Sequence, residues 1–425
     1  MILEITKERA INVKLYPIYK MLSWDLLFYY SIIFLFLTQV KGISASDVLL
    51  ADSFYVIFRV ILLIPLTALI EKIGKRRSII FANISLCISI LTFILSQNFT
   101  FIIIANLFQA LGFVIKNMAE SNLLYDSLPQ NNKRGDIFSR IEGRGSALYY
   151  FTNALSLIIS GFLYVYNAYL PLILCLIMCI LSVIISFKFH DVIKIDNEEE
   201  ITVKEYVKNL EYSFKNLFKS SRLRNLIFFG ATFSSLLYLL VTIRSGLLTE
   251  LNIPEQYFGI IFGVLDIVAG LTAREQYVIH KRFRNRSLTV LSLPVSISCL
   301  LIGVAIFCKL PFYFIISIIL LMFLIQYICK APFYNLIKQY LNNFTNASIR
   351  NKISASYNLM ESTFRALLSF IVSLLLNITT ISIAFVYIGG IFTLIFIVFL
   401  EHMKTKVGLS PDKYSKKDIE FLELK

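Results

Sequence analysis

The stretch Leu69–Ser78, LIEKIGKRRS, places five charged residues and one glycine between two long apolar runs. The charged residues are Glu71, Lys72, Lys75, Arg76 and Arg77. They leave no apolar face that a globular core could bury. A connection this short has to turn sharply, and Gly74 can adopt backbone angles that other residues resist. The stretch therefore predicts a tight basic turn between two antiparallel helices.

Apolar runs of about 20 residues recur on both sides of this turn, and each is long enough to cross a hydrocarbon layer of about 30 Å. The chain is 57% hydrophobic and only 16% charged, whereas soluble domains are about 25% charged. The composition predicts an all-α polytopic membrane protein. Twelve spans are predicted, with approximate bounds 17–39, 48–70, 79–96, 101–122, 146–166, 170–188, 226–248, 257–277, 288–308, 312–334, 355–377 and 380–400.

Basic residues occupy alternate connections between these spans, which indicates how the chain is oriented. One set of loops carries Lys72, Lys75, Arg76, Arg77, Lys133, Arg134, Arg140, Lys281, Arg282, Arg284, Arg286, Arg350 and Lys352. The opposite set has only Lys41 and Lys309. Because basic loops stay in the cytoplasm, we expect these loops and both termini there. The predicted location is the cell membrane, of bacterial type, with the lipid bilayer as a partner.

The longest connection, residues 190–225, divides the spans six and six. The predicted organisation is an N-terminal six-helix bundle at 1–189, this linker, a C-terminal six-helix bundle at 226–402 and a cytoplasmic tail at 403–425. Within the linker, apolar residues recur at spacings of three and four: Val203, Val207, Leu210, Phe214 and Leu217. With lysines on another face, they predict an amphipathic helix on the anionic inner leaflet. A solvated linker helix is the alternative.

A second basic turn, VIHKRFRNRS at 278–287, follows the eighth span as LIEKIGKRRS follows the second. The two halves of the chain are therefore similar in layout. Pseudo-symmetric halves are a common build for secondary transporters, whose substrate site lies at the interface between them.

The extended turn PLTALIEKIGKRRS, Pro65 to Ser78, resembles the loop signature of the major facilitator superfamily. That signature runs glycine, three residues, aspartate, a basic residue, any residue, glycine and two basic residues. Glu71 stands at its acidic position, Lys72 follows, Gly74 is the turn glycine, and Lys75 and Arg76 form the basic pair. Thr67 replaces the leading glycine. The resemblance implies that this loop is a conformational switch that latches the two halves in the outward-open state. The alternative is a basic turn that only sets topology.

Two signatures of drug and proton exchange in this superfamily are missing. Asn106 in IANLFQALG stands where those exporters have arginine, and the fifth span, ALYYFTNALSLIISGFLY, has one glycine and no Gly-Pro. Their absence leaves the predicted fold intact and weakens the case for export and for the usual proton route.

Ionisable residues inside spans are costly and normally face protein or a water-filled cavity. The carboxylates Asp25 and Asp266 lead as proton-coupling candidates. Asp25 lies about eight residues into its span, and Asp266 falls near the middle of its own, with no basic residue within a turn. Glu120 and Glu361 are further candidates. Three pairs suit one helix face, Lys116 with Glu120, Glu361 with Arg365 and Asp52 with Arg59, and structural neutralisation is the alternative reading of each. Arg244 and Lys330 complete the set of intramembrane charges.

The candidate substrate-cavity residues combine aromatic rings with polar or charged groups, which suit amphiphilic molecules. They are Trp24, Tyr29, Arg59, Lys116, Tyr150, Asn153, Tyr238, Gln326, Lys330, Tyr334 and Arg365. With 23 Tyr and 37 Phe in the chain, many aromatic residues must instead face lipid.

Other classes of function have little support in the sequence. The net charge of +14 lies at the ends of spans, so nucleic acid is not an expected partner. The six cysteines lie in apolar segments with no neighbouring ligands, so no metal or cofactor is predicted. The three histidines lie in loops or the tail, which disfavours a membrane enzyme such as an acyltransferase. No GxxxxGK[ST] stretch points to ATP.

The predicted function is therefore secondary active transport of a small, amphiphilic molecule by a monomer. Efflux coupled to protons, as in an antiporter, is the first hypothesis, and a metabolite importer or facilitator of the same fold is the alternative.

Overall fold

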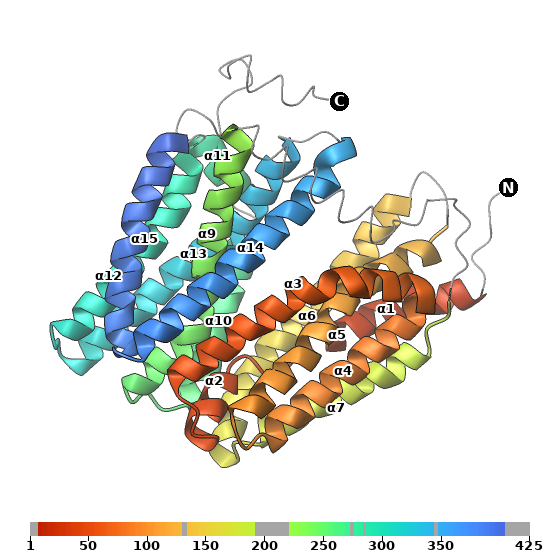
Figure 1. The fold of residues 1–425 in the computed structure, drawn as a ribbon, viewed down its shortest axis with the longest axis horizontal. Helices are drawn as coiled ribbons and strands as arrows, with labels where there is room; N and C mark the ends of the chain where they lie inside the picture. Colours follow the sequence, from red (N-terminus) through yellow and green to blue (C-terminus); the bar gives the residue numbers. More distant parts are fainter. Residues whose placement is uncertain are drawn as a thin grey trace. The chain divides into compact units, whose positions relative to one another are not determined.

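The computed structural model describes residues 7–129, 134–191, 221–272, 276–283, 286–343 and 347–403. Across these residues the chain is built from helices, which Figure 1 colours from red to blue along the sequence. The predicted linker helix at 203–217 and the tail beyond Met403 lie outside the described residues.

The first half begins with an interrupted segment made of α1 (Lys7–Ser23), α2 (Ile33–Leu35) and the π-helix η1 (Phe36–Val40). Five long helices follow it: α3 (Ala45–Ile73), α4 (Lys75–Leu95), α5 (Phe99–Ser127), α6 (Arg134–Tyr166) and α7 (Leu170–Phe187). Side-chain caps mark two of their starts, because Ser44 accepts from Asp47 N at 3.0 Å and Asn98 from Phe101 N at 3.3 Å.

The second half contains α9 (Ser221–Glu250), α10 (Gln256–Thr272), the short α11 (Gln276–Phe283), α12 (Ser287–Phe307), α13 (Phe312–Asn343), α14 (Ala347–Leu376) and α15 (Ile381–Met403). Nine helices in the described ranges are long and apolar enough to cross a membrane. With α3, the shorter α10 and the α1 to η1 segment, a helical element lies at each of the twelve predicted spans.

The first predicted span, 17–39, is not one continuous helix. It is interrupted between Ser23 and Ile33, and Phe28 there has a φ of 64°. The freed Phe28 N–H donates to Ser156 Oγ of α6 at 3.4 Å, and Asp25 accepts from Leu26 N at 2.9 Å. Side chains thus satisfy backbone groups that an unbroken helix would have satisfied itself.

The helices form two compact units, Met1–Tyr206 with Ile253–Gly263 and Val207–Asn252 with Val264–Lys425. In the first unit, α4 packs on α5 and α7, α3 on α5, and α1 on α6 and α7. In the second, α12 packs on α13 and α15, and α9 on α14 and α15. The α12–α15 crossing is close: a Cβ on Gly389 would lie 2.3 Å from Leu300 N.

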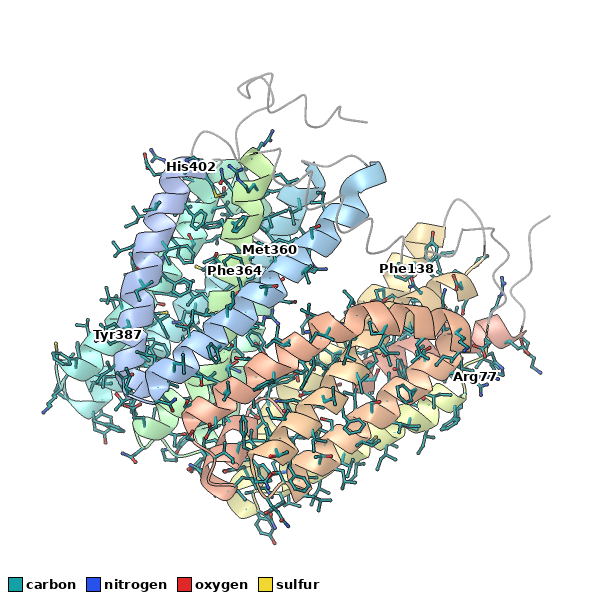
Figure 2. The ribbon with its side chains drawn as sticks, in the orientation of Figure 1. Arg77, Phe138, Met360, Phe364, Tyr387 and His402 are labelled. Atoms are coloured by element: carbon teal, nitrogen blue, oxygen red, sulfur yellow. The ribbon has the colours of Figure 1, made fainter. Side chains whose placement is uncertain are left out.

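Each unit has its own apolar interior. Tyr19, Ile79 and Ala82 are fully buried in the first unit. In the second, the Phe233 ring packs edge-on against Phe333 at 4.4 Å and Phe396 at 5.3 Å. Apolar side chains also cover the outer faces of helices, as on α15, where Leu394 and Val398 are exposed together with Tyr387 (Figure 2). Such faces fit lipid rather than water.

Candidate functional site

The charged turn Leu69–Ser78 connects α3 to α4 through one residue, Gly74. Gly74 has φ 86° and ψ 157°, a combination essentially confined to glycine. Its carbonyl accepts from Ser78 N at 3.1 Å and Ser78 Oγ at 2.7 Å. Lys72 is exposed in the last turn of α3, and the Glu71 side chain lies outside the described residues. The predicted sharp turn is present, and Gly74 makes it.

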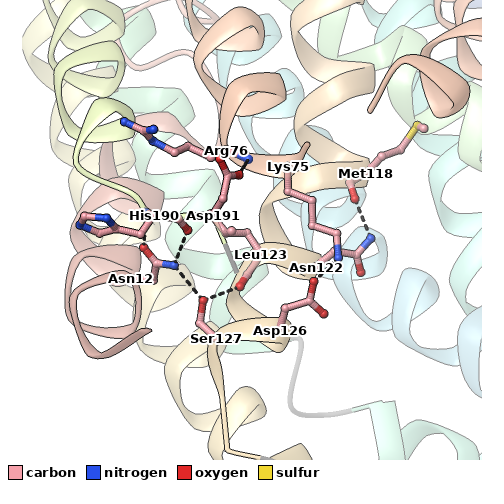
Figure 3. A network of polar contacts seen from close by, with 10 residues as sticks. All are labelled: Asn12, Lys75, Arg76, Met118, Asn122, Leu123, Asp126, Ser127, His190 and Asp191. Carbon is pink, nitrogen blue, oxygen red and sulfur yellow. Dashed lines mark hydrogen bonds and ion pairs between the residues drawn. The ribbon is translucent and has the colours of Figure 1, made fainter. Parts of the chain in front are cut away.

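The basic pair after this glycine attaches the turn to other helices of the first unit (Figure 3). Lys75 forms an ion pair with Asp126 near the end of α5. Arg76 donates from Nη2 to the Phe187 carbonyl at 2.9 Å, and its backbone N–H donates to Asp191 Oδ1 at 3.3 Å. The start of α4 is therefore tied to the ends of α5 and α7.

Asn12 of α1 completes this connection, and Figure 3 shows it beside the end of α5. Its Nδ2 donates to Ser127 Oγ at 3.0 Å and to the His190 carbonyl at 2.9 Å, while its Oδ1 accepts from His190 N at 2.9 Å. Asn12, Lys75, Arg76, Asp126 and Asp191 thus connect four helices of the first unit, α1, α4, α5 and α7, at one end.

A second polar cluster lies inside the first unit, on α1, α4 and α5. Tyr19 donates a hydrogen bond to Glu120, and Asn83 Nδ2 donates to Tyr19 Oη at 2.9 Å. Lys116 Nζ lies 3.7 Å from Glu120 Oε1, with the Lys116 side chain 2% exposed. The predicted pairing of Lys116 with Glu120 is confirmed. The charges neutralise each other in an interior where either alone would be costly.

Next to this cluster, α1 and α6 share an ion pair and a group of aromatic rings. Lys20 pairs with Glu142, and Lys20 Nζ also lies 4.3 Å from the centre of the Trp24 ring. Trp24 packs edge-on against Tyr149 at 4.9 Å and Tyr150 at 5.2 Å. Tyr150 is 62% exposed. Two of the predicted cavity residues, Trp24 and Tyr150, are thus in contact at the surface of the first unit.

Asp25 begins the interruption of the first span, next to Trp24. Its Oδ1 accepts from Tyr30 Oη at 2.6 Å and from Leu26 N at 2.9 Å. Within the described part of the chain, Asp25 makes no ion pair. Tyr29 is buried and packs against Phe93 at 5.8 Å.

The remaining first-half candidates lie on α3 and α6. The Arg59 guanidinium lies 5.7 Å from the centre of the Tyr55 ring. The pairing of Asp52 with Arg59 stays a prediction. Asn153 is half-buried, and its Oδ1 makes no hydrogen bond to a described residue.

In the second unit, Glu361 and Arg365 of α14 form the predicted ion pair, with Arg365 Nη2 at 2.8 Å from Glu361 Oε1. The guanidinium also lies over the Tyr238 ring of α9, 3.9 Å from its centre. Tyr334 is half-buried beside Phe333, with ring centres 5.7 Å apart. Arg365 and Tyr238, both predicted as cavity residues, thus contact each other.

A second charged group of this unit gathers around the Tyr327 ring. Arg244 of α9 and Lys330 of α13 lie over that ring, with Cζ at 5.4 Å and Nζ at 4.9 Å from its centre. The charge of Asp266, on α10, acts on both cations. Gln326 Nε2 donates to Ser298 Oγ at 3.0 Å. Asp266 has no cation near it in sequence, but the fold brings two within reach of its charge.

Several partners found in the structure were not predicted as site residues: Tyr19, Lys20, Asn83, Asp126 and Glu142. All belong to contacts between helices, and the only signal in the sequence is a polar residue within or beside an apolar run. Among the described residues, no group of three His, Cys, Asp or Glu side chains could hold a metal ion.

The sequence matches the model of the Major Facilitator Superfamily over residues 20–367. The chain belongs to this superfamily. Its transporters fold as two bundles of six helices, which accounts for the twelve spans and for an integral membrane protein. A search of curated protein sequences found no significant match.

Solved structures of other transporters are similar to the chain in fold. The nucleoside transporter NupG is 14% identical with a TM-score of 0.67, covering 94% of this chain and 98% of its own. A D-xylose-proton symporter is 13% identical with a TM-score of 0.66, covering 93% and 96%. A bacterial homologue of the human lysosomal transporter Spinster, inward-facing, is 11% identical with a TM-score of 0.68, covering 96% and 99%. At these identities the similarity establishes the fold alone.

Proposed function

We propose that this superfamily member is a secondary active transporter that moves a small amphiphilic molecule by alternating access, coupled to protons. The observation that carries the proposal is Asp25, a half-buried carboxyl group at the interruption of the first span, hydrogen-bonded to a tyrosine. Carboxyl groups inside the membrane commonly serve as proton relays in transporters.

The contacts support Asp25 over Glu120 and Glu361 as the proton carrier. The Tyr30 hydroxyl can donate to the carboxylate and accept from the acid, so it suits both protonation states. Glu120 and Glu361 each face a cation four residues away on the same helix. Protonation of either would leave a buried cation without its counter-charge. Asp266 is the remaining competitor.

The exposed aromatic group of Trp24 and Tyr150 supports an amphiphilic cargo. Aromatic rings provide large apolar contact area, and the tyrosine hydroxyl provides a polar end. Trp24 is half-buried and Tyr150 is exposed, so both are accessible to a molecule at the surface of the first unit.

Outward transport is the direction that we propose, with both termini in the cytoplasm of a bacterial cell. The basic loops support the orientation through the positive-inside rule. A second candidate is uptake of a metabolite. It is supported by a structural neighbour, the D-xylose-proton symporter, and by the missing exchange signatures at Asn106 and in the fifth span.

The test is transport by purified protein in proteoliposomes, with and without an imposed pH gradient. The cargo panel comprises labelled xylose, a nucleoside, an amino acid, a lipophilic cation and hippurate. We expect wild-type protein to accumulate one of these classes when a gradient is imposed, and the sign of the effective gradient gives the direction. The Asp25→Asn variant should lose gradient-driven accumulation and retain exchange at equal concentrations, because asparagine keeps the shape but cannot release a proton.

Two variants control this experiment. Glu8→Gln removes an exposed carboxylate from the same segment and should leave transport unchanged. Asp266→Asn tests the competing assignment. Unchanged gradient-driven accumulation in Asp25→Asn together with its loss in Asp266→Asn would assign the proton to Asp266 and contradict the proposed role of Asp25.

A further inference from the structure

A small pocket lies between α9 and α13 of the second unit. Its polar lining residues are Arg244, Gln326, Tyr327 and Lys330, and its apolar lining comes from Leu237, Leu240, Val241 and Phe323. The residues recur at helical spacing: 237, 241 and 244 on α9, and 323, 326, 327 and 330 on α13. Each helix therefore turns one face to the pocket. The room inside is about that of one water molecule, which suits a small charged group rather than a whole cargo.

The charged side chains that line the pocket are both basic. They are Arg244 and Lys330, and the charge of Asp266 acts on both. Among the described residues, Lys330 forms no ion pair. Arg244 is 4% exposed, so solvent screens its charge poorly. Two cations in a pocket that is otherwise lined mainly by apolar side chains favour an anion.

A hydrogen-bond donor in the pocket points to the same ligand. Tyr327 is 3% exposed, and its hydroxyl makes no hydrogen bond to any described residue. Buried polar groups are normally hydrogen-bonded. The amide of Gln326 already donates to Ser298, so the Tyr327 hydroxyl remains as an uncharged donor in the pocket. A hydroxyl donor in one pocket with a guanidinium and an ammonium group matches the two oxygens of a carboxylate.

We propose that this pocket binds the carboxylate of an organic anion whose apolar part stays outside it. The cargo class would then be an aromatic or aliphatic carboxylate rather than a lipophilic cation. That the bound anion is transported rests on the proposed function. Its binding does not, and it can be measured without transport.

The test measures binding to the purified full-length protein by isothermal titration calorimetry and by the thermal unfolding midpoint. Hippurate and 2-naphthoate are compared with their neutral amides, hippuramide and 2-naphthamide, and with chloride and inorganic phosphate. We expect the two carboxylates to bind and raise the midpoint, while the amides bind at least about tenfold more weakly, a factor that corresponds to about 1.4 kcal/mol. This comparison uses wild-type protein and does not depend on how any variant folds.

Substitutions then test whether the anion binds in this pocket. Arg244→Gln and Lys330→Gln should each weaken hippurate binding at least about tenfold, and Tyr327→Phe should weaken it several-fold. Lys330→Arg, which keeps the charge, should retain binding. The matched control is Lys338→Gln, which removes an exposed lysine from the same helix and should have no effect.

Equal binding of carboxylates and amides would overturn the inference, as would an equal loss in Lys338→Gln and Lys330→Gln. If chloride or phosphate raised the midpoint as much as the carboxylates, the pocket would be a site for inorganic anions and the assignment of the cargo would fail. Carboxylate binding without gradient-driven transport would contradict the proposed proton coupling and leave this inference standing.

Discussion

At the scale of single residues, the buried Glu120 and Lys116 of the first unit each have a partner of opposite charge. Glu120 has a hydroxyl donor in Tyr19 and a cation in Lys116, and Tyr19 is itself held by Asn83. Removing one member of such a group leaves the others desolvated and without their partner, which costs more than the group contributes as a whole.

This view predicts a non-additive effect on stability. Lys116→Met should lower the free energy of unfolding by about 3 kcal/mol, because it leaves the Glu120 carboxylate buried without its cation. The double variant Lys116→Met with Glu120→Gln should recover much of that loss. Thermal unfolding in detergent measures both, with the exposed Lys72→Met as control. A double variant that is as unstable as the sum of its single variants would contradict the pairing.

Residues on one helix could be paired from the sequence, and residues on different helices could not. The i,i+4 spacing was sufficient for Lys116 with Glu120 and for Glu361 with Arg365, because helical geometry fixes their proximity. Lys75 with Asp126, and Asp266 near Arg244, depend on which helices pack together. Which helices pack together is determined by their shape and by how closely they can approach, as at Gly389 on Leu300. Apolar runs in the sequence do not indicate these packing partners.

At the scale of elements, hydropathy located every span but not the interruption of the first. No glycine or proline marks residues 24–32. The break is supported by contacts with α6, where Ser156 receives the Phe28 N–H. The turn at Gly74 was predictable for the opposite reason, since one glycine between two helices has to adopt unusual backbone angles itself.

Gly74→Val should impair transport while leaving membrane insertion intact. A β-branched side chain at φ 86° and ψ 157° costs about 1–3 kcal/mol, so the turn should shift and disturb the attachment of Lys75 and Arg76. We expect turnover in proteoliposomes to fall by about tenfold, the factor for about 1.4 kcal/mol. Glu71→Ala should likewise impair cycling.

Gly143→Val, on an exposed position of α6 with no neighbour within 4 Å, is the matched control and should transport normally. To verify insertion, a membrane-impermeant thiol reagent should label Lys281→Cys only from the cytoplasmic side, in a background without the native cysteines. Full transport by Gly74→Val and Glu71→Ala would reduce the loop to a topology signal.

At the scale of the whole molecule, composition and span count identify a polytopic membrane protein, and its superfamily of transporters follows from the match over residues 20–367. What the chain carries is a more local property. We propose that it depends on the few charged and aromatic groups that each unit holds inside, such as Asp25 in the first and the cations Arg244 and Lys330 in the second. Transport without ATP is the claim on which the roles of all these groups depend.

Counterflow tests that claim most directly. Proteoliposomes are loaded with one unlabelled probe at high concentration, xylose, a nucleoside, an amino acid, a lipophilic cation or hippurate, and diluted into a trace of the same labelled probe, with no ATP and no ion gradient. The account predicts that for one class the label accumulates transiently above its equilibrium level and then decays, while protein-free liposomes show no overshoot. If folded, monodisperse protein gave no overshoot with any class, or accumulated label only when ATP was supplied, the chain would not be the secondary transporter described above.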